Sequence, residues 1–382
     1  MIGLIIFIVF AVFISAVIYE RMKIKKIRDN SWRHAEMLMS SSSQNDPAWN
    51  KTTIIDYTKN VFRAYYSAWA SLDPSNLEKF LSDNFLKKTV LEMSVVKGLG
   101  RSFVLDLNSD VNITIVEAND NNGNVGDTFT AEITYAFKLG TFLNPAKMLR
   151  DKKRLLSPNI IEYWKFTREE TGWQLDKIWS DYFVRPNLMV AGIEENIQNF
   201  AQENGFYYDP DFGKIMLPDK GKVFTKYNEE QGVSNHTIGM WDKKILEFYI
   251  YHGCYSSGDS KVCANYVVAQ AILPKPYSNM IIESRKSDIA LFSNIGSSLE
   301  KINTESVDFD KQYSVYRNKE DRVNVLELLP PNFMMHLIGL NFPVYIEIVD
   351  NILYVGTKHS KNGVGYKEML EVLCWAFDEM KM

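Results

Sequence analysis

Cysteine and histidine are scarce in this chain, and their scarcity excludes several kinds of metal and disulfide protein. The sequence contains three cysteines and five histidines, with no CxxC pair and no HExxH motif. An odd number of cysteines without a CxxC pair argues against a disulfide framework and against a structural zinc site. The histidines show no metal-ligand spacing, so the sequence predicts neither a metal nor any other cofactor.

Motifs of the common enzyme classes are also missing. The chain has no GxGxxG, no GxxxxGK[ST] and no GxSxG sequence, so it lacks the usual signatures of nucleotide binding and serine hydrolysis. Its net charge of -4 gives no indication of a nucleic-acid partner. His252 and Cys254 approach a catalytic pair, but no third group orients the histidine. We therefore expect a protein that binds rather than an enzyme.

One long hydrophobic run is present, at the very start. Met1 to Tyr19 contains no charged side chain and has about the 20 apolar residues that cross a bilayer. The residues that carry positive charge directly after it are Arg21, Lys23, Lys25, Lys26 and Arg28. The positive-inside rule then predicts a single span in the inner or plasma membrane, with the N-terminus outside and the body in the cytoplasm.

The alternative interpretation of this run is a cleaved signal peptide. Its charges lie on the wrong side of the apolar segment, and no small-x-small cleavage site follows. We therefore expect an uncleaved anchor at residues 1–19, and we expect the basic residues behind it to contact anionic lipid head groups. Residues 20–48 read as a juxtamembrane segment and linker, because Ser40 to Pro47 (SSSSQNDP) has linker composition.

A first folded domain is predicted at residues 49–189. Apolar and aromatic residues from Lys51 onward recur at three- and four-residue steps, which predicts an amphipathic helix. Pro74 is expected to begin a second, short helix. The segments that alternate at period two, or pair across a Gly turn, are 111–118, 127–140, 160–170 and 173–183. The predicted fold class is α+β, with two helices followed by a curved antiparallel sheet.

This order resembles the cone fold of the nuclear-transport-factor-two type. AYYSAWASLDPSNLEKFLSDNF (64–85) and EYWKFTREETGWQLDKIW (162–179) are similar to the Tim-forty-four-like domain. That family includes the membrane tether of the mitochondrial import motor and its bacterial relatives. The resemblance covers about residues 49–184 and implies a docking role at membranes. The same aromatic residues would also serve as hairpin core, because cross-strand packing favours them.

The aromatic load of this domain supplies the candidate binding residues, which are Tyr65, Tyr66, Trp69, Tyr135, Trp164 and Trp173. They predict a membrane-anchored scaffold that docks a membrane or secretory protein, an apolar peptide or a membrane surface. The alternative is a small-molecule or lipid site inside the cone, or an isomerase- or hydrolase-type enzyme there. Such an enzyme needs an inward carboxylate in an apolar pocket. The candidates for it are Asp106, Glu132, Glu162 and Asp176, and strand alternation places Glu132 outward.

A connecting helix is predicted at 190–205, followed by a second α+β domain at 206–382. Its expected strand-rich runs are 222–226, 237–252, 262–273 and the hairpin 342–358, with helices after Pro330-Pro331 and at 365–380. It resembles a bacterial domain of unknown function found behind membrane helices, through Phe200-Ala201, Asn204-Gly205-Phe206 and Tyr208. A bridge between Cys254 and Cys263 is geometrically possible. In a reducing cytoplasm we expect two free thiols instead.

Overall fold

The computed structural model divides the chain into two compact units, which are described separately. One unit contains Met1–Thr89 and Ser102–Val184, and the other contains Val90–Arg101 and Arg185–Met382. The residues that the structure describes are Tyr19, Met22, Lys26, 28–104, 111–121, 125–138, 140–143, 156–179, 193–209, 218, 220–227, 229–258, 260–286, 299–319, 328–359 and 365–380.

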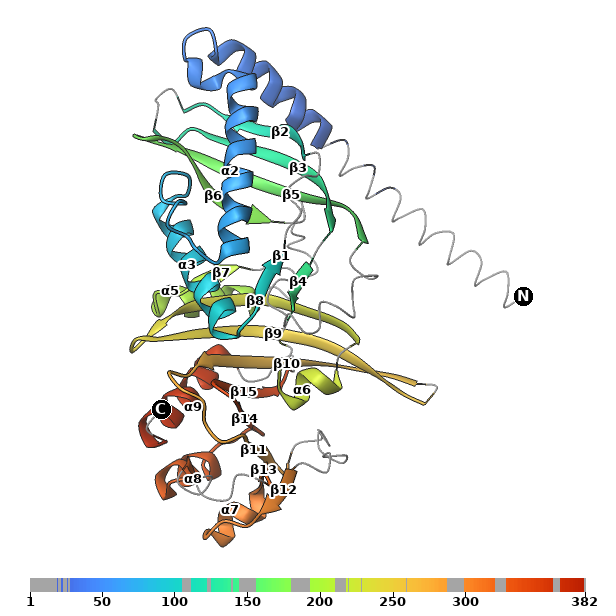
Figure 1. The fold of residues 1–382 in the computed structure, drawn as a ribbon, viewed down its shortest axis with the longest axis vertical. Helices are drawn as coiled ribbons and strands as arrows, with labels where there is room; N and C mark the ends of the chain where they lie inside the picture. Colours follow the sequence, from blue (N-terminus) through green and yellow to red (C-terminus); the bar gives the residue numbers. More distant parts are fainter. Residues whose placement is uncertain are drawn as a thin grey trace, which may run out of the picture. The chain divides into compact units, whose positions relative to one another are not determined.

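The first unit has the predicted order of helices followed by an antiparallel sheet. Its elements are η1 (Pro47–Trp49), α2 (Lys51–Ser71), the start of α3 (Asp83–Gly98), β1 (Ser102–Val104), β2 (Val111–Asn119), β3 (Thr128–Lys138), β4 (Gly140–Leu143), β5 (Leu156–Glu169) and β6 (Gly172–Trp179). The sheet has the strand order β2-β3-β5-β6, and β1 pairs with β4. Helix α2 crosses one face of this sheet (Figure 1), and its buried stripe supplies the aromatic half of the core.

The predicted linker is largely helical. Residues 28–42 form a helix that continues through the serines, and a turn leads from it into η1. Ala35 and Met39, one turn apart, are buried. The serine hydroxyls donate within this segment or across it: Ser41 to the carbonyl of Leu38 and Ser42 to Asp120 at 2.6 Å. Packing of Ala35 and Met39 therefore overrides the linker composition.

The short helix predicted from Pro74 does not form. Tight turns occupy residues 74–80, and the next helix, α3, starts only at Asp83. The backbone of this segment is held by β6 instead, because Leu175 N–H donates to Phe80 O at 2.7 Å and Ser82 N–H donates to Leu175 O at 2.9 Å. Leu81 is nevertheless buried, as its spacing predicted.

The second unit is built on one antiparallel sheet with the strand order β12-β13-β11-β14-β15-β10-β9-β8-β7. Its strands are β7 (Tyr207–Asp209), β8 (Glu229–Trp241), β9 (Lys244–Ser257), β10 (Ser260–Ile272), β11 (Met280–Ser284), β12 (Leu299–Ile302), β13 (Tyr313–Asn318), β14 (Tyr345–Val349) and β15 (Ile352–Lys358). Its helices, besides the end of α3, are α5 (Ile193–Glu203), α6 (Lys222–Lys226), α7 (Val307–Gln312), α8 (Pro331–Ile338) and α9 (Tyr366–Glu379). The predicted connecting helix, C-terminal hairpin and terminal helix are thus present.

One face of this sheet carries an apolar core, and the other carries polar and aromatic side chains. Leu246, Phe248 and Val355 belong to the core that packs with the helices. Because side chains alternate along a strand, Glu247 and Tyr354 face the opposite way. Glu247, Gln270, Tyr354 and Glu347 follow one another across four neighbouring strands. This row of buried polar side chains distinguishes the second unit from an ordinary two-layer domain, whose buried side chains are mostly apolar.

Two further expectations for this unit are wrong. Lys222–Lys226 is a helix rather than a strand, since Gly221 precedes it with φ 95° and Glu347 accepts the Lys222 N–H. Cys254 and Cys263 face each other on β9 and β10 and form a disulfide rather than two free thiols. Their direct cross-strand pairing supplies the required approach.

Among the described residues, no helix is both long and apolar enough to cross a membrane. The predicted span at residues 1–19 lies outside the described residues except for Tyr19.

Candidate binding sites in the two units

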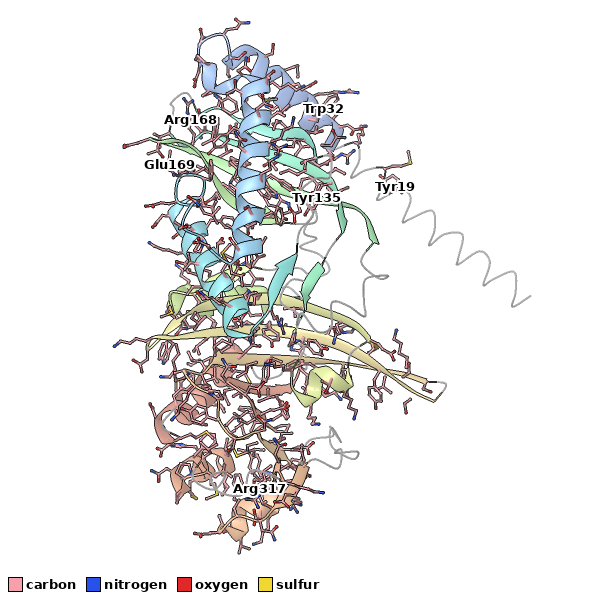
Figure 2. The ribbon with its side chains drawn as sticks, in the orientation of Figure 1. Tyr19, Trp32, Tyr135, Arg168, Glu169 and Arg317 are labelled. Carbon is pink, nitrogen blue, oxygen red and sulfur yellow. A yellow bond between two sulfur atoms is a disulfide. The ribbon has the colours of Figure 1, made fainter. Side chains whose placement is uncertain are left out.

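The six predicted binding aromatics form the core of the first unit. Tyr65, Tyr66 and Trp69 come from the buried face of α2, and Tyr135, Trp164 and Trp173 come from β3, β5 and β6. All six are buried, with Trp173 the most exposed at 9 %. Figure 2 shows Tyr135 on the sheet beside α2. They do not form an exposed docking surface, so a direct contact with a partner requires the domain to open.

These rings fill the space between α2 and the sheet. Phe62 lies with its centroid 4.8 Å from Tyr66, 5.0 Å from Tyr135 and 5.5 Å from Trp164, mostly edge-to-face. Edge-to-face pairs at these separations add about 0.5–1.5 kcal/mol beyond the burial of their area. Trp49 packs in the same way against Trp173 at 5.1 Å. The high aromatic content of this unit is thus explained by the stability that ring packing gives its core.

A carboxylate nevertheless points into this aromatic core. Glu162 on β5 pairs with Ile133, which is fully buried, so its side chain shares the inward face of the sheet. Tyr66 Oη donates to Glu162 Oε1 at 2.6 Å, and Trp164 Nε1 donates to Oε2 at 2.9 Å. Tyr66 and Tyr135 are also hydrogen-bonded to each other at 3.0 Å. Each carboxylate oxygen therefore has a donor from the aromatic core.

The surroundings of Glu162 favour its neutral form. Burial raises the pKa of its carboxyl, and the bonds from Tyr66 and Trp164 oppose that rise. Burial also raises the pKa of Tyr66, as does the nearby Glu162 carboxylate. The side chain is only partly buried by its accessible surface. Of the three described carboxylates considered for acid–base chemistry (Glu132, Glu162 and Asp176), this is the one with the required environment.

The other two described carboxylates lack it. Glu132 faces outward as expected, where it accepts from Tyr163 at 2.9 Å and pairs with Arg28 at 3.4 Å. Asp176 accepts from Ser82 Oγ at 2.9 Å and fixes the chain before α3. Asp106 lies outside the described residues.

The predicted lipid-contact residues are only partly described. Lys26 is exposed. Arg28 forms its ion pair with Glu132 on the sheet, so part of its charge is engaged within the unit. Arg21, Lys23 and Lys25 lie outside the described residues.

A pocket of about 270 Å³ opens in the second unit, beside the polar row of its sheet. Gly221, Lys222 and Thr225 line it from the α6 segment, and Asn279 lines it from just before β11. Strands β11 to β14 supply the rest: Met280, Ile281, Leu299, Asn318, Glu347, Ile348 and Val349. Its wall thus combines apolar side chains with one carboxylate, one ammonium, two amides and one hydroxyl. That composition is typical of sites for small molecules.

Glu347 and Lys222 are the two charged residues that line this pocket. Only 4 % of the residue is exposed, and Lys222 N–H donates to its Oε2 at 2.7 Å. Among the described residues, no hydrogen bond reaches its Oε1. Burial raises the pKa of this carboxyl to about 7, although the Lys222 bond and charge oppose the shift. Oε1 is accessible from the pocket rather than enclosed, and it can accept a hydrogen bond from a ligand that donates one.

Glycine makes the approach of α6 to Glu347 possible. A Cβ at Gly221 would lie 2.9 Å from Glu347 Oε2 and 3.1 Å from the Phe224 ring, and its φ of 95° is strained for other residues. Sequence reasoning missed this site. The available signal was a single acidic residue inside the apolar run VYIEIV of a strand buried on both faces.

The two units together define an α+β protein with a packed aromatic domain and a pocket-bearing domain. No protein-family model matches the chain, and no curated protein matches it. Among solved structures, the mycobacterial trehalose monomycolate transport factor A, TtfA, is similar with a TM-score of 0.35 and 10 % identity. It covers 50 % of this chain and 94 % of that one. A similarity this low carries no argument about function.

Proposed function

We propose that this protein is a membrane-anchored binding protein whose second unit holds a small molecule in the Glu347 pocket. The observation that carries the proposal is the Glu347 carboxyl, which lines a pocket of about 270 Å³ and whose Oε1 accepts no hydrogen bond from the described residues. The predicted anchor at residues 1–19 would keep this site at the membrane surface.

The residues that line the pocket favour one class of ligand, a small organic amine whose other atoms are mostly apolar. An ammonium or amine N–H would donate to Glu347 Oε1, and its charge would favour the ionised carboxylate. Met280, Ile281 and Leu299 would cover the apolar part. Thr225 and Asn318 would offer polar contacts to a second group. At Glu347 a carboxylate ligand of the same size would instead meet like charge, and Lys222 is the lining residue that would attract it.

The test uses the full-length protein in lipid nanodiscs. Saturation-transfer NMR would compare small aliphatic and aromatic amines with their carboxylate counterparts. We expect the amines to bind to the wild-type protein. Their affinity should fall at least tenfold in Glu347→Gln, because the substitution keeps the shape of the side chain and removes its charge. Glu162→Gln is the matched control, since it makes the same change at the inward carboxylate of the first unit. If amines bind to Glu347→Gln but not to Glu162→Gln, the binding site lies in the first unit and the proposal for the Glu347 pocket is wrong.

The cone domain is the second candidate, and it concerns the membrane surface. Trp32 and Met37 are exposed on the helix that follows the basic run, at 37 % and 66 %, and Trp32 is labelled in Figure 2. Tryptophan is enriched at membrane interfaces. The likeness to the Tim-forty-four-like family, given by residues 64–85 and 162–179, also implies docking at membranes. We propose that this helix rests on the anionic head groups beside the anchor.

A fluorescent probe would test this contact. A polarity-sensitive dye is attached at Met37→Cys in a background with Cys254→Ser, Cys263→Ser and Cys374→Ser, and the protein is reconstituted in vesicles with or without anionic lipid. We expect a blue shift at Met37 that grows with anionic lipid. Asn60→Cys, an exposed position on α2, is the control and should not respond. Equal responses at both positions would refute docking by this helix. Docking of a protein by the six buried aromatics stays a prediction.

A further inference from the structure

Three metal-ligating side chains converge at one end of the β9–β10 pair. They are His252, Cys254 and Cys263, and their ligand atoms all lie within 4.8 Å of one another. His252 and Cys254 are two residues apart on β9 and face the same side, and Cys263 lies directly opposite Cys254 on β10. We call these three residues the His–Cys–Cys cluster.

The histidine of the cluster is held in the form that a metal ligand needs. His252 Nδ1 donates to Asn265 Oδ1 at 2.5 Å, and Asn265 is its cross-strand partner on β10. The lone pair is then on Nε2, which lies 3.8 Å from Cys254 Sγ. Metal-ligating histidines are usually fixed in this way by a second bond from the other ring nitrogen. A disulfide alone needs no such histidine.

We propose that the His–Cys–Cys cluster, with its disulfide reduced, binds one thiophilic divalent cation of the Zn²⁺ class. A cellular dithiol supplies two electrons and two protons, which break the Cys254–Cys263 bond and leave two thiols. The reductant becomes a disulfide. Each thiol loses its proton when the cation binds, so two thiolates and one imidazole become ligands. Sulfur and imidazole donors suit Zn²⁺.

The site has two exclusive states. In the disulfide state both sulfurs are bonded to each other and the cation has no thiolate ligand. In the reduced state the three ligands leave a fourth position for water, as in open zinc sites. Cys263 and His252 are exposed, so reductant and metal reach the cluster from solvent. The third cysteine, Cys374, is a free thiol on α9 and belongs to no such group in the described residues.

The experiment titrates Co²⁺, a spectroscopic substitute for Zn²⁺, into the full-length protein in detergent. The protein is reduced with a phosphine and desalted without oxygen, and an oxidised sample serves as reference. We expect a thiolate-to-cobalt charge-transfer band that saturates at one metal per chain, and no band from the oxidised sample. Zn²⁺ should displace the band, since it binds the same site more tightly.

Variants identify the ligands. Cys263→Ser is the main variant because Cys263 is exposed, and it should abolish the band. Asn265→Ala removes only the partner of His252 and should weaken binding about 10–100-fold. Cys374→Ser is the matched control and should bind as the parent does. A band that survives in Cys263→Ser, or its absence from the reduced parent, would overturn the proposal. Circular dichroism of each variant separates loss of a ligand from loss of the fold.

Discussion

Glu347→Gln gives the sharpest test of the second unit, because it replaces a carboxyl whose ionisation depends on the fold. Burial raises the pKa of this group from 4.5 to about 7 in the folded protein. The folded state therefore holds a proton that the unfolded state releases between these values. Stability contributed by the protonated carboxyl is present at acidic pH and is lost as pH rises to about 7.

The magnitude follows from the size of the shift. Each pKa unit corresponds to 1.36 kcal/mol, so a shift of about 2.5 units amounts to about 3 kcal/mol. Glutamine cannot ionise and keeps an oxygen for the Lys222 N–H. We therefore expect Glu347→Gln to be close to wild type at about pH 4 and more stable by about 3 kcal/mol at about pH 8.

Thermal unfolding measured at several pH values provides the assay. The second unit has about 200 residues, for which 1 kcal/mol shifts Tm by about 2–4 °C. The variant should gain about 6–12 °C over wild type between about pH 4 and pH 8. Glu300→Gln is the control, since Glu300 is partly exposed and pairs with Arg317 at 2.8 Å. If the difference between Glu347→Gln and wild type is independent of pH, the carboxylate has a partner and the argument for the pocket fails.

Two further predictions concern the packing of the units. Gly239→Ala should cost about 1–3 kcal/mol, because its Cβ would lie 1.8 Å from the Phe206 ring; Gly232→Ala on the same strand meets no atom within 4 Å and should be nearly neutral in chemical unfolding. Tyr66→Phe and Glu162→Gln should each destabilise the first unit, and their double-mutant cycle should show a coupling of about 0.5–3 kcal/mol. Additive effects would mean that their 2.6 Å hydrogen bond contributes nothing.

The sequence predicted the elements whose hydrophobic period is long and regular. Helix α2 and the alternating strand β3 lie where their patterns place them, with Ile133 inward and Glu132 outward. The terminal helix and the hairpin around Asp350 are likewise present, and Asp350 takes the positive φ that this turn requires. In these segments local pattern and tertiary packing agree.

The predictions were wrong where contacts between residues far apart in the sequence determine the local structure. Lys222–Lys226 has a strand-like composition, but a carboxylate 125 residues later accepts its first N–H and favours a helical turn. The inward position of Glu162 followed from the pairing of β3 with β5, which the alternation of a single strand does not give. The Glu347 pocket and the His–Cys–Cys cluster are likewise assembled by cross-strand register. Register across nine strands is not visible in local spacing.

The state of the His–Cys–Cys cluster depends on the side of the membrane on which the body lies. The basic flank predicts a cytoplasmic body, and the cytoplasm keeps thiols reduced. The disulfide seen here is instead the form expected in an oxidising compartment. A membrane-impermeant maleimide applied to intact spheroplasts and to inverted vesicles distinguishes the two, with Cys263→Ser as control. Because Cys254 and Cys263 form a disulfide, we expect labelling at Cys263 only after reduction; labelling in inverted vesicles without a reductant would show that the reduced state is the resting state in the cytoplasm. Labelling in spheroplasts that requires a reductant would reverse the predicted topology, and the disulfide would then be the resting state.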